Sequence, residues 1–368
     1  MSPIAFAAAG HAALAAGMGI GRFAFTPILP LMQAEGALTL AGGGSLAAAN
    51  YAGYLAGALS APLLTRSLGA RAGLVGVALL TLAMGFDQGL AGRIALRAAA
   101  GVASAWVLIH VSAWSLERLA RSPALGGVLY AGVGTGAALA GGVCLVVLHL
   151  HLAARSAWIA LGLVAFGLSV ALWPLLTDQK KTGAPAVRHR WTRDSLKLVW
   201  CYAAFGFGYI IPATFIPAAA REALGEPALY GWAWPLFGAA AAVSTVAAAP
   251  LARHAGERGL WIGGHLVMAL GIAAPLALAG MTGIVVCALC VGATFMVVTM
   301  AGLQEGRKAG GVALLAPMTA AFAAGQIAGP AFVSLLARAG GGLEHASIVA
   351  CLALVASALA LFLRRTEP

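Results

Sequence analysis

Long apolar stretches separated by short polar turns run along the whole chain. Most approach the roughly 20 apolar residues that an α-helix needs to cross the hydrocarbon core of a membrane. The alternation of apolar and polar residues that marks the strands of a membrane barrel is missing. The pattern therefore predicts an all-α membrane protein with twelve transmembrane helices, near residues 4–31, 45–64, 72–87, 90–114, 125–147, 156–176, 196–219, 228–249, 259–280, 282–303, 311–336 and 345–363.

The composition excludes a water-soluble fold. The chain of 368 residues is 61% hydrophobic and 9% charged, whereas soluble domains are roughly 25% charged. Its mean hydropathy is +0.94. The first apolar stretch lacks both a basic leading segment and a small-residue cleavage site, so we expect a retained helix and not a signal peptide.

The basic residues indicate an orientation. With the N-terminus in the cytoplasm, the inner loops and the tail hold sixteen Lys and Arg residues and the outer loops hold four. This bias predicts that both termini are cytoplasmic, because the inner loops of membrane proteins are enriched in Lys and Arg. It also explains the net charge of +11 without a nucleic-acid partner, and it makes the anionic inner leaflet of the lipid bilayer the neighbour of these residues.

An internal repeat divides the chain in two. The string Gly-Ile-Gly-Arg at residues 19–22 recurs 187 residues later as Gly-Phe-Gly-Tyr at residues 206–209. We therefore expect two six-helix halves of the same orientation, residues 1–176 and 196–368, joined by a cytoplasmic linker at 177–195. Parallel repeats of this kind rock about a central site in secondary transporters. The same shift carries Pro30, Arg66, Gly69 and Arg71 onto Pro217, Arg253, Gly256 and Arg258.

Five strings spread over the chain carry a family resemblance. They are Gly19–Pro30, Asn50–Leu59, Ala131–Gly136, Gly206–Tyr209 with Thr214 and Phe215, and Gly325–Pro330. Through them the sequence resembles the major facilitator superfamily and, within it, the YbfB/YjiJ-type transporters. The resemblance implies a secondary transporter in which helices 1, 4, 7 and 10 line a central cavity. One departure is Arg66, which stands where the loop motif of the superfamily usually has an acidic residue.

Two arginines, Arg22 and Arg97, lie inside the first and fourth predicted spans. An arginine at the centre of a membrane helix costs about 2.5–3.5 kcal/mol and is normally paired or hydrated. All eleven acidic residues fall in predicted loops or at helix ends. The sequence therefore predicts that both guanidinium groups bind a carboxylate, phosphate or sulfonate, which suits their planar fork. The alternatives are that each arginine donates to carbonyls of a broken helix, or that Arg97 extends to the outer surface.

Five further polar residues complete the predicted substrate site. Tyr209 has the position on helix 7 that the first arginine has on helix 1. Asn50 and Tyr54 share one face of helix 2 because they are four residues apart. Thr26 belongs to the string that carries the first arginine, and Gln326 lies on helix 11. Helix packing, or anchoring of tyrosines at the membrane surface, is the competing explanation for these side chains.

Proton coupling needs a carrier, and no acidic residue is predicted in mid-membrane. His11, His110 and Glu305 are the candidates, because histidine titrates near neutral pH. Only His11 shares a face with the arginine of its own helix. The alternatives are histidines that are hydrogen-bonded between helices, and a Glu305 that pairs with one of the basic residues at 307 and 308. Exchange of one anion for another needs no proton carrier.

A metal site has weaker support in the sequence. His265, Met296 and Met300 resemble the ligands of a soft copper site, but methionines also fill helix interfaces. No nucleotide-binding loop, catalytic triad or pair of carboxylates is present in the sequence. We therefore expect neither a cofactor nor an enzyme.

Together these patterns predict a secondary active transporter of the bacterial inner membrane that acts as a monomer. It is expected to work by alternating access and to move a small organic anion by anion exchange or proton coupling. The alternatives are a proton-driven efflux pump for drugs or metabolites, a copper transporter, and a receptor that moves no substrate. Efflux of cations would need acidic residues in the cavity, and the predicted spans contain none.

Overall fold

The computed structural model describes residues 2–119, 122–176, 191–224, 226 and 230–363, and this part of the chain contains helices and no strand. Its elements are α1 (Pro3–Leu14), the π-helical turn η1 (Ala15–Ile20), α2 (Phe25–Ala34), α3 (Leu40–Ser60), η2 (Ala61–Leu63), α4 (Arg66–Ala83), α5 (Gly89–Leu119), α6 (Pro123–His149), α7 (Ala154–Leu172), η3 (Trp173–Leu175), α8 (Arg193–Leu224), α10 (Ala233–Ala277), α11 (Gly280–Arg338) and α12 (Leu343–Phe362). The predicted all-α membrane fold is confirmed.

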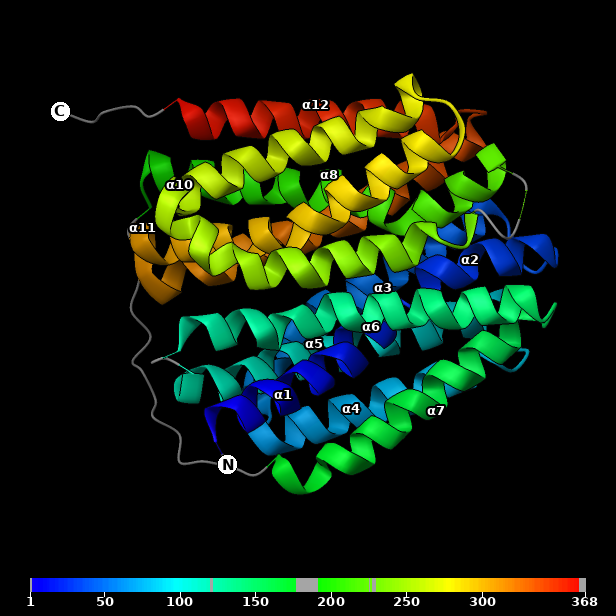
Figure 1. Ribbon diagram of the computed structural model, residues 1–368, viewed down its shortest axis with the longest axis horizontal. Coiled ribbons are helices and arrows are strands. Elements are labelled where there is room, and N and C mark those ends of the chain that lie inside the picture. The colour runs from blue at the N-terminus through cyan, green and yellow to red at the C-terminus, as the bar shows by residue number, and fades with distance from the viewer. Residues whose placement is uncertain (1, 120–121, 177–190, 225, 227–229, 364–368) are drawn as a thin grey trace.

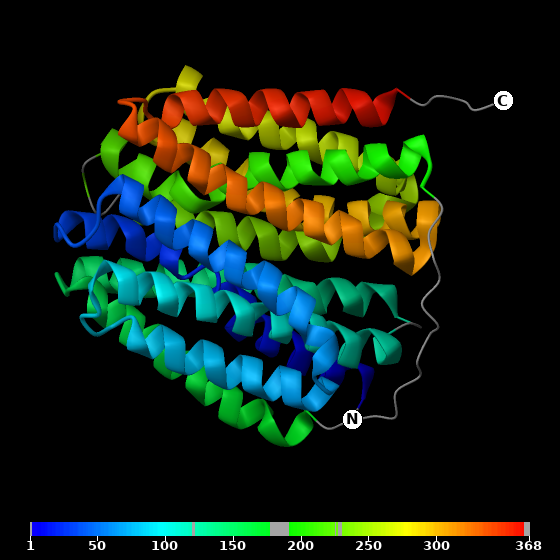
Figure 2. The same ribbon diagram turned by 180° about the vertical axis from the view of Figure 1, so that it is seen from behind.

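The predicted spans correspond to these elements, although not one to one. Ten helical segments of the described chain are long and apolar enough to cross a membrane. α10 holds two predicted spans, which meet at Gly256, a residue with φ +68° and ψ 162° that breaks the helical path. α11 also holds two predicted spans, 282–303 and 311–336, and the matching apolar segments of the structure are Gly280–Gly310 and Leu314–Arg338. The ribbon of α11 turns back on itself at one end of the bundle (Figure 2).

The helices form two groups that lie side by side. Figure 1 shows α1 to α7 on one side of the molecule and α8 to α12 on the other, with the start of α1 and the end of α12 at the same end of the bundle. We call these groups the N-terminal and C-terminal halves. α8 begins at Arg193, inside the predicted linker, while residues 177–190 of that linker lie outside the described part.

Equivalent positions of the two halves meet at their interface. The hydroxyl of Thr26 on α2 donates to the carbonyl of Ala213 on α8 at 3.1 Å. These two residues are 187 positions apart, which is the shift of the sequence repeat. The helices of the two halves also pack closely elsewhere at the interface. A Cβ added to Gly238 of α10 would lie 2.2 Å from the backbone nitrogen of Ala138 on α6.

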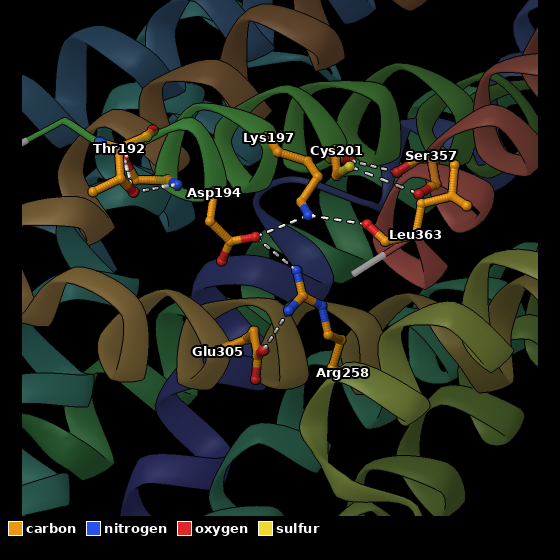
Figure 3. A network of polar contacts seen from close by, with 9 residues as sticks. Thr192, Asp194, Lys197, Cys201, Arg258, Glu305, Ser357 and Leu363 are labelled. Carbon is orange, nitrogen blue, oxygen red and sulfur yellow. Dashed lines mark hydrogen bonds and ion pairs between the residues drawn. The ribbon is translucent and has the colours of Figure 1, made fainter. Parts of the chain in front are cut away.

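Ion pairs join the helices of the C-terminal half near the end of the bundle where α12 ends (Figure 3). Asp194 on α8 lies 2.9 Å from Lys197 and 3.1 Å from Arg258 on α10. Arg258 also lies 3.7 Å from Glu305 on α11. The pairing of Glu305 with a basic neighbour at 307 or 308 was therefore wrong for the described structure, because residues two apart face different ways on a helix and Lys308 donates to Glu257 instead.

Candidate functional site

The first membrane-spanning segment changes its hydrogen-bonding pattern beside Arg22. α1 gives way to the π-helical turn at Ala15–Ile20, and α2 follows after one further turn. Pro27 contributes to this change because it has no N–H to donate to the carbonyl of Phe23. The N–H of Thr26 donates to that carbonyl instead, at 3.2 Å. The carbonyl of Arg22 is therefore left without the i+4 donor of a regular α-helix.

Arg97 donates to the carbonyls that this irregular turn exposes. Its Nη1 donates to the carbonyl of Gly21 at 3.2 Å, and its Nη2 donates to the carbonyl of Arg22 at 3.0 Å. The Arg97 guanidinium carbon lies 5.2 Å from the ring centre of Phe25 and 6.0 Å from that of Trp158. All four partners belong to the N-terminal half. This is the carbonyl-bonded arrangement that remained open as an alternative for Arg97.

Arg22 points toward the interface between the halves. Its Nη2 donates to the side-chain oxygen of Gln326 on α11. The Arg22 guanidinium carbon lies 4.1 Å from the ring centre of Tyr54, 4.9 Å from that of Tyr51 and 5.7 Å from that of Phe23. The Arg22 side chain is buried, and its Nε has no hydrogen-bond acceptor among the described residues. The positive charge is therefore surrounded by aromatic rings and one neutral amide.

Neither buried arginine is neutralised by an acidic side chain of the described chain. The ion pairs of that part join Arg93, Lys197, Arg258 and Lys308 to carboxylates at helix ends. Buried charges in proteins are normally paired. Among the described residues, no carboxylate therefore supplies a counter-charge to Arg22.

A chain of polar contacts connects Arg22 to the C-terminal half. The side-chain nitrogen of Gln326 donates to the hydroxyl of Tyr209 at 2.8 Å. Arg22 and Tyr209 have equivalent positions in the sequence repeat, and Gln326 bridges them. Beside this chain, the hydroxyls of Tyr51 on α3 and Thr214 on α8 lie 3.1 Å apart. Five of the seven residues predicted to bind substrate thus lie at the interface: Arg22, Thr26, Tyr54, Tyr209 and Gln326.

Asn50 has a different position from the one expected of a ligand-binding residue. Its Nδ2 donates to the backbone carbonyl of Arg97 at 2.9 Å. The Asn50 side chain is fully buried, and its Oδ1 has no donor among the described residues. Asn50 therefore ties α3 to α5 behind the site, within the N-terminal half.

The three candidate proton carriers lie apart from the guanidinium of Arg22. His11 places Nδ1 at 2.8 Å from the carbonyl of Val128 on α6. The ring of His110 packs against α4 so closely that a Cβ added to Gly69 would lie 2.0 Å from a ring carbon. Glu305 belongs to the ion pairs of Figure 3.

The residues considered for copper, His265, Met296 and Met300, come from α10 and α11. His265 on α10 accepts a hydrogen bond from the indole nitrogen of Trp261 at 3.0 Å, and its ring lies 5.7 Å from that of Phe205. Met296 is buried on α11. Within the described residues there is no group of three or more His, Cys, Asp or Glu side chains that suits a metal ion.

Sequence reasoning missed three site residues: Tyr51 and Phe23, which contact Arg22, and Thr214, which contacts Tyr51. Tyr51 lies three residues before Tyr54, so the two rings share a helix face. Such a pair of tyrosines near a membrane arginine is the signal that was available, because guanidinium groups stack on aromatic faces. Thr214 carries no comparable signal in the sequence.

Comparison with known proteins identifies the family. The model of a family described as "Uncharacterised MFS-type transporter YbfB" matches residues 14–362. The chain belongs to this family of the major facilitator superfamily. The crystal structure of a bacterial homologue of the human lysosomal transporter Spinster, in an inward-facing and occupied conformation, has the same fold, with a TM-score of 0.71 at 13% sequence identity over 99% of this chain and 97% of that one. No curated protein sequence gives a match.

Membership of the major facilitator superfamily confirms the predicted class of protein. The chain is a multi-pass membrane protein and a secondary transporter, not an enzyme, and its partners are a small-molecule substrate and membrane lipid. In this family member, the irregular first helix, the aromatic rings around Arg22 and the bridge through Gln326 lie where the two halves meet.

Proposed function

We propose that this transporter carries a small organic anion, a carboxylate, phosphate or sulfonate, whose charged group binds Arg22. The observation that carries the proposal is the buried guanidinium at the interface between the halves, with an unpaired Nε and no carboxylate partner in the described chain. Planar oxyanions accept two parallel hydrogen bonds from such a group. An incoming anion would replace the neutral oxygen of Gln326 with a charged acceptor.

Arg97 has a supporting role in this proposal. Its guanidinium holds the carbonyls of Gly21 and Arg22, and so it fixes the turn from which the Arg22 side chain extends. Asn50 in turn holds the backbone of Arg97. We therefore assign anion binding to Arg22 and positioning to Arg97.

The contacts between the halves support alternating access as the mode of transport. Arg22 with Gln326, Tyr51 with Thr214, and Thr26 with Ala213 each join one half to the other. These contacts must break when the halves rock apart, and an anion bound to Arg22 is well placed to compete with the first of them. The proposed working unit is a monomer, because one chain supplies both halves.

The bacterial inner membrane, with both termini in the cytoplasm, is the proposed setting. The excess of Lys and Arg in alternate loops supports this orientation. In the described structure, α1 begins and α12 ends at the same end of the bundle, as this orientation requires (Figure 1). Anion exchange or proton coupling would supply the driving force.

The test begins with the thermal unfolding of the purified protein in the presence of carboxylates, phosphates and sulfonates. A ligand at 100 times its dissociation constant stabilises the folded state by about 2.7 kcal/mol. Arg22→Gln should weaken binding of the stabilising anion about 10- to 150-fold, because a hydrogen bond to a charged group contributes about 1.5–3 kcal/mol. Transport of the same anion into liposomes should fall in parallel.

Arg71→Gln is the matched control. The Arg71 guanidinium lies 4.8 Å from the ring centre of Trp173 and donates to the carbonyl of that residue at 3.0 Å, so it combines the same kinds of contact away from the interface. Arg71→Gln should bind the anion as the wild type does. Full transport by Arg22→Gln would contradict the proposal, and so would a panel in which only cations stabilise the protein.

A further inference from the structure

A row of aromatic rings in the C-terminal half lies next to Arg22. We call Trp234, Phe237, Phe295, Tyr209 and Phe322 the ring stack. Consecutive members are nearly parallel, with interplanar angles of 7°, 16°, 5° and 5° and ring-centre distances of 4.4, 5.4, 5.6 and 5.8 Å. The rings come from α10, α11 and α8, so the stack crosses three helices of one half.

The N-terminal half covers this stack with one ring, that of Phe23. Phe23 lies 6.0 Å from Phe295 at an angle of 74°, and 6.1 Å from Trp234 at 50°. Phe23 is the residue after Arg22, so the same short segment contributes both the guanidinium and the covering ring. When the halves rock apart, the faces that Phe23 covers lose their partner.

The two halves thus offer different chemistry at equivalent positions. Position 22 holds an arginine in the N-terminal half, and position 209 of the C-terminal half holds a tyrosine within the ring stack. The Tyr209 hydroxyl receives a hydrogen bond from Gln326, which also accepts one from Arg22. The guanidinium and the stack are therefore separated by a single amide side chain.

We infer that the substrate is an aryl anion, with its charged group on Arg22 and its ring against Phe295 and Trp234, the two rings that Phe23 contacts. This inference rests on the proposed function, since it needs the anion to bind Arg22. A planar ring can restore the contacts that Phe23 gives up, and aromatic pairs gain energy beyond simple burial of area. Packing of the C-terminal helices alone does not require rings directly beside the charge.

The test compares three probes on the full-length protein by thermal unfolding. Benzoate has both the charge and the ring, cyclohexanecarboxylate has the charge and a saturated ring of similar size, and benzamide has the ring without the charge. Benzoate should bind roughly two- to tenfold more tightly than cyclohexanecarboxylate, and benzamide should give no shift. Arg22→Gln should remove the responses to both anions.

Phe295→Leu keeps apolar volume but removes the central ring of the stack. The rise in melting temperature with benzoate should therefore fall toward the rise with cyclohexanecarboxylate. Phe332→Leu is the control, because Phe332 is also on α11 but pairs with Phe207 at 5.9 Å, outside the stack. Should Phe295→Leu not fold, Trp234→Leu removes the other ring that Phe23 contacts. If the wild type binds benzoate and cyclohexanecarboxylate equally tightly, and both need Arg22, the inference of an aryl substrate is wrong while the proposed function stands. If Arg22→Gln binds both anions as tightly as the wild type does, the proposed function is wrong.

Discussion

The two buried arginines have different surroundings and therefore different expected roles. Arg97 donates two hydrogen bonds to backbone carbonyls of its own half. Arg22 donates to Gln326 of the other half and has a free Nε among the described contacts. Replacing the first leaves buried carbonyls without donors, whereas replacing the second removes a charge that no described carboxylate neutralises. Measurements of stability and of transport on variants of each arginine should therefore distinguish their roles.

Arg97→Gln is predicted to lower the melting temperature of the empty transporter. Each buried polar group that loses its partner costs about 1–3 kcal/mol, and Arg97 satisfies two. Arg22→Gln should lower the melting temperature less, because only the Gln326 oxygen loses its donor and the removal of a buried charge offsets this loss. Thermal unfolding of both variants without ligand measures the contrast.

Arg93→Gln serves as the control for this comparison. Arg93 is one turn before Arg97 on α5 and donates to a single carbonyl, that of Ala37, at 3.0 Å. Its replacement should cost less stability than that of Arg97. A melting temperature of Arg97→Gln equal to that of the wild type would show that the carbonyl bonds do not hold the turn.

The sequence alone located the arginines but could not assign their partners. Depth in the membrane and the lack of acidic neighbours were predicted from composition and spacing. In the described structure both arginines are buried among helices and neither has an acidic partner. The direction of each guanidinium depends on which carbonyls the irregular turn exposes. Which carbonyls are exposed depends on the π-helical turn at Ala15–Ile20, and the periodicity of the sequence does not predict a π-helical turn.

At the scale of elements, the irregular first helix is the feature that sets Arg22 apart from an ordinary membrane residue. π-Helical turns occur often at functional sites. A regular helix through this segment would satisfy its own carbonyls and leave Arg97 without acceptors. Close packing also limits the segment, because a Cβ added to Gly19 would lie 2.4 Å from the Cα of Gly136 on α6.

Pro27→Ala is predicted to reduce transport while preserving or raising stability. The new N–H can donate to the carbonyl of Phe23, which frees the N–H of Thr26 for the carbonyl of Arg22 and displaces Arg97 from it. Pro27 lies in the first turn of α2, where a proline costs little, and its replacement adds a backbone hydrogen bond, so the melting temperature should not fall. Liposome uptake and thermal unfolding, measured on the same preparation, check both parts.

Pro30→Ala is the matched control, since Pro30 lies within α2 three residues later. Its replacement should affect stability in the same direction and leave anion affinity as it is in the wild type. If Pro27→Ala transports at the wild-type rate, the irregular turn is a packing feature and does not present Arg22.

The elements themselves were largely predictable, and the differences have physical reasons. Hydropathy predicted the membrane-spanning stretches because lipid requires long apolar helices. It could not show that the span at 4–31 consists of α1, η1 and α2, since a π-helical turn has the same composition as the helix around it. The turn at Gly256 was indicated by the repeat with Gly69, although only the structure gives its positive φ.

At the scale of the whole molecule, the net charge at the site decides which steps of the proposed transport cycle respond to the membrane potential. Without a bound anion, Arg22 and Arg97 contribute two buried positive charges, and a bound monovalent anion lowers the total to one. Moving one elementary charge through the membrane potential involves about 2.3 kcal/mol per 100 mV. The membrane potential therefore opposes or drives the return of the empty transporter. Exchange of two monovalent anions moves no net charge and does not respond to the potential.

We predict that transport is mainly exchange. Liposomes loaded with the anion should show rapid counterflow that is insensitive to membrane potential and to a pH gradient, while anion-free liposomes should show slow, potential-dependent uptake. His11→Gln and Glu305→Gln should retain counterflow, because His11 contacts a carbonyl and Glu305 belongs to an ion-pair network away from Arg22. Strong stimulation of uptake by a pH gradient into anion-free liposomes, lost in His11→Gln, would establish proton coupling instead. Alternating access about Arg22 is compatible with either result, so this measurement decides the coupling without depending on the choice of anion.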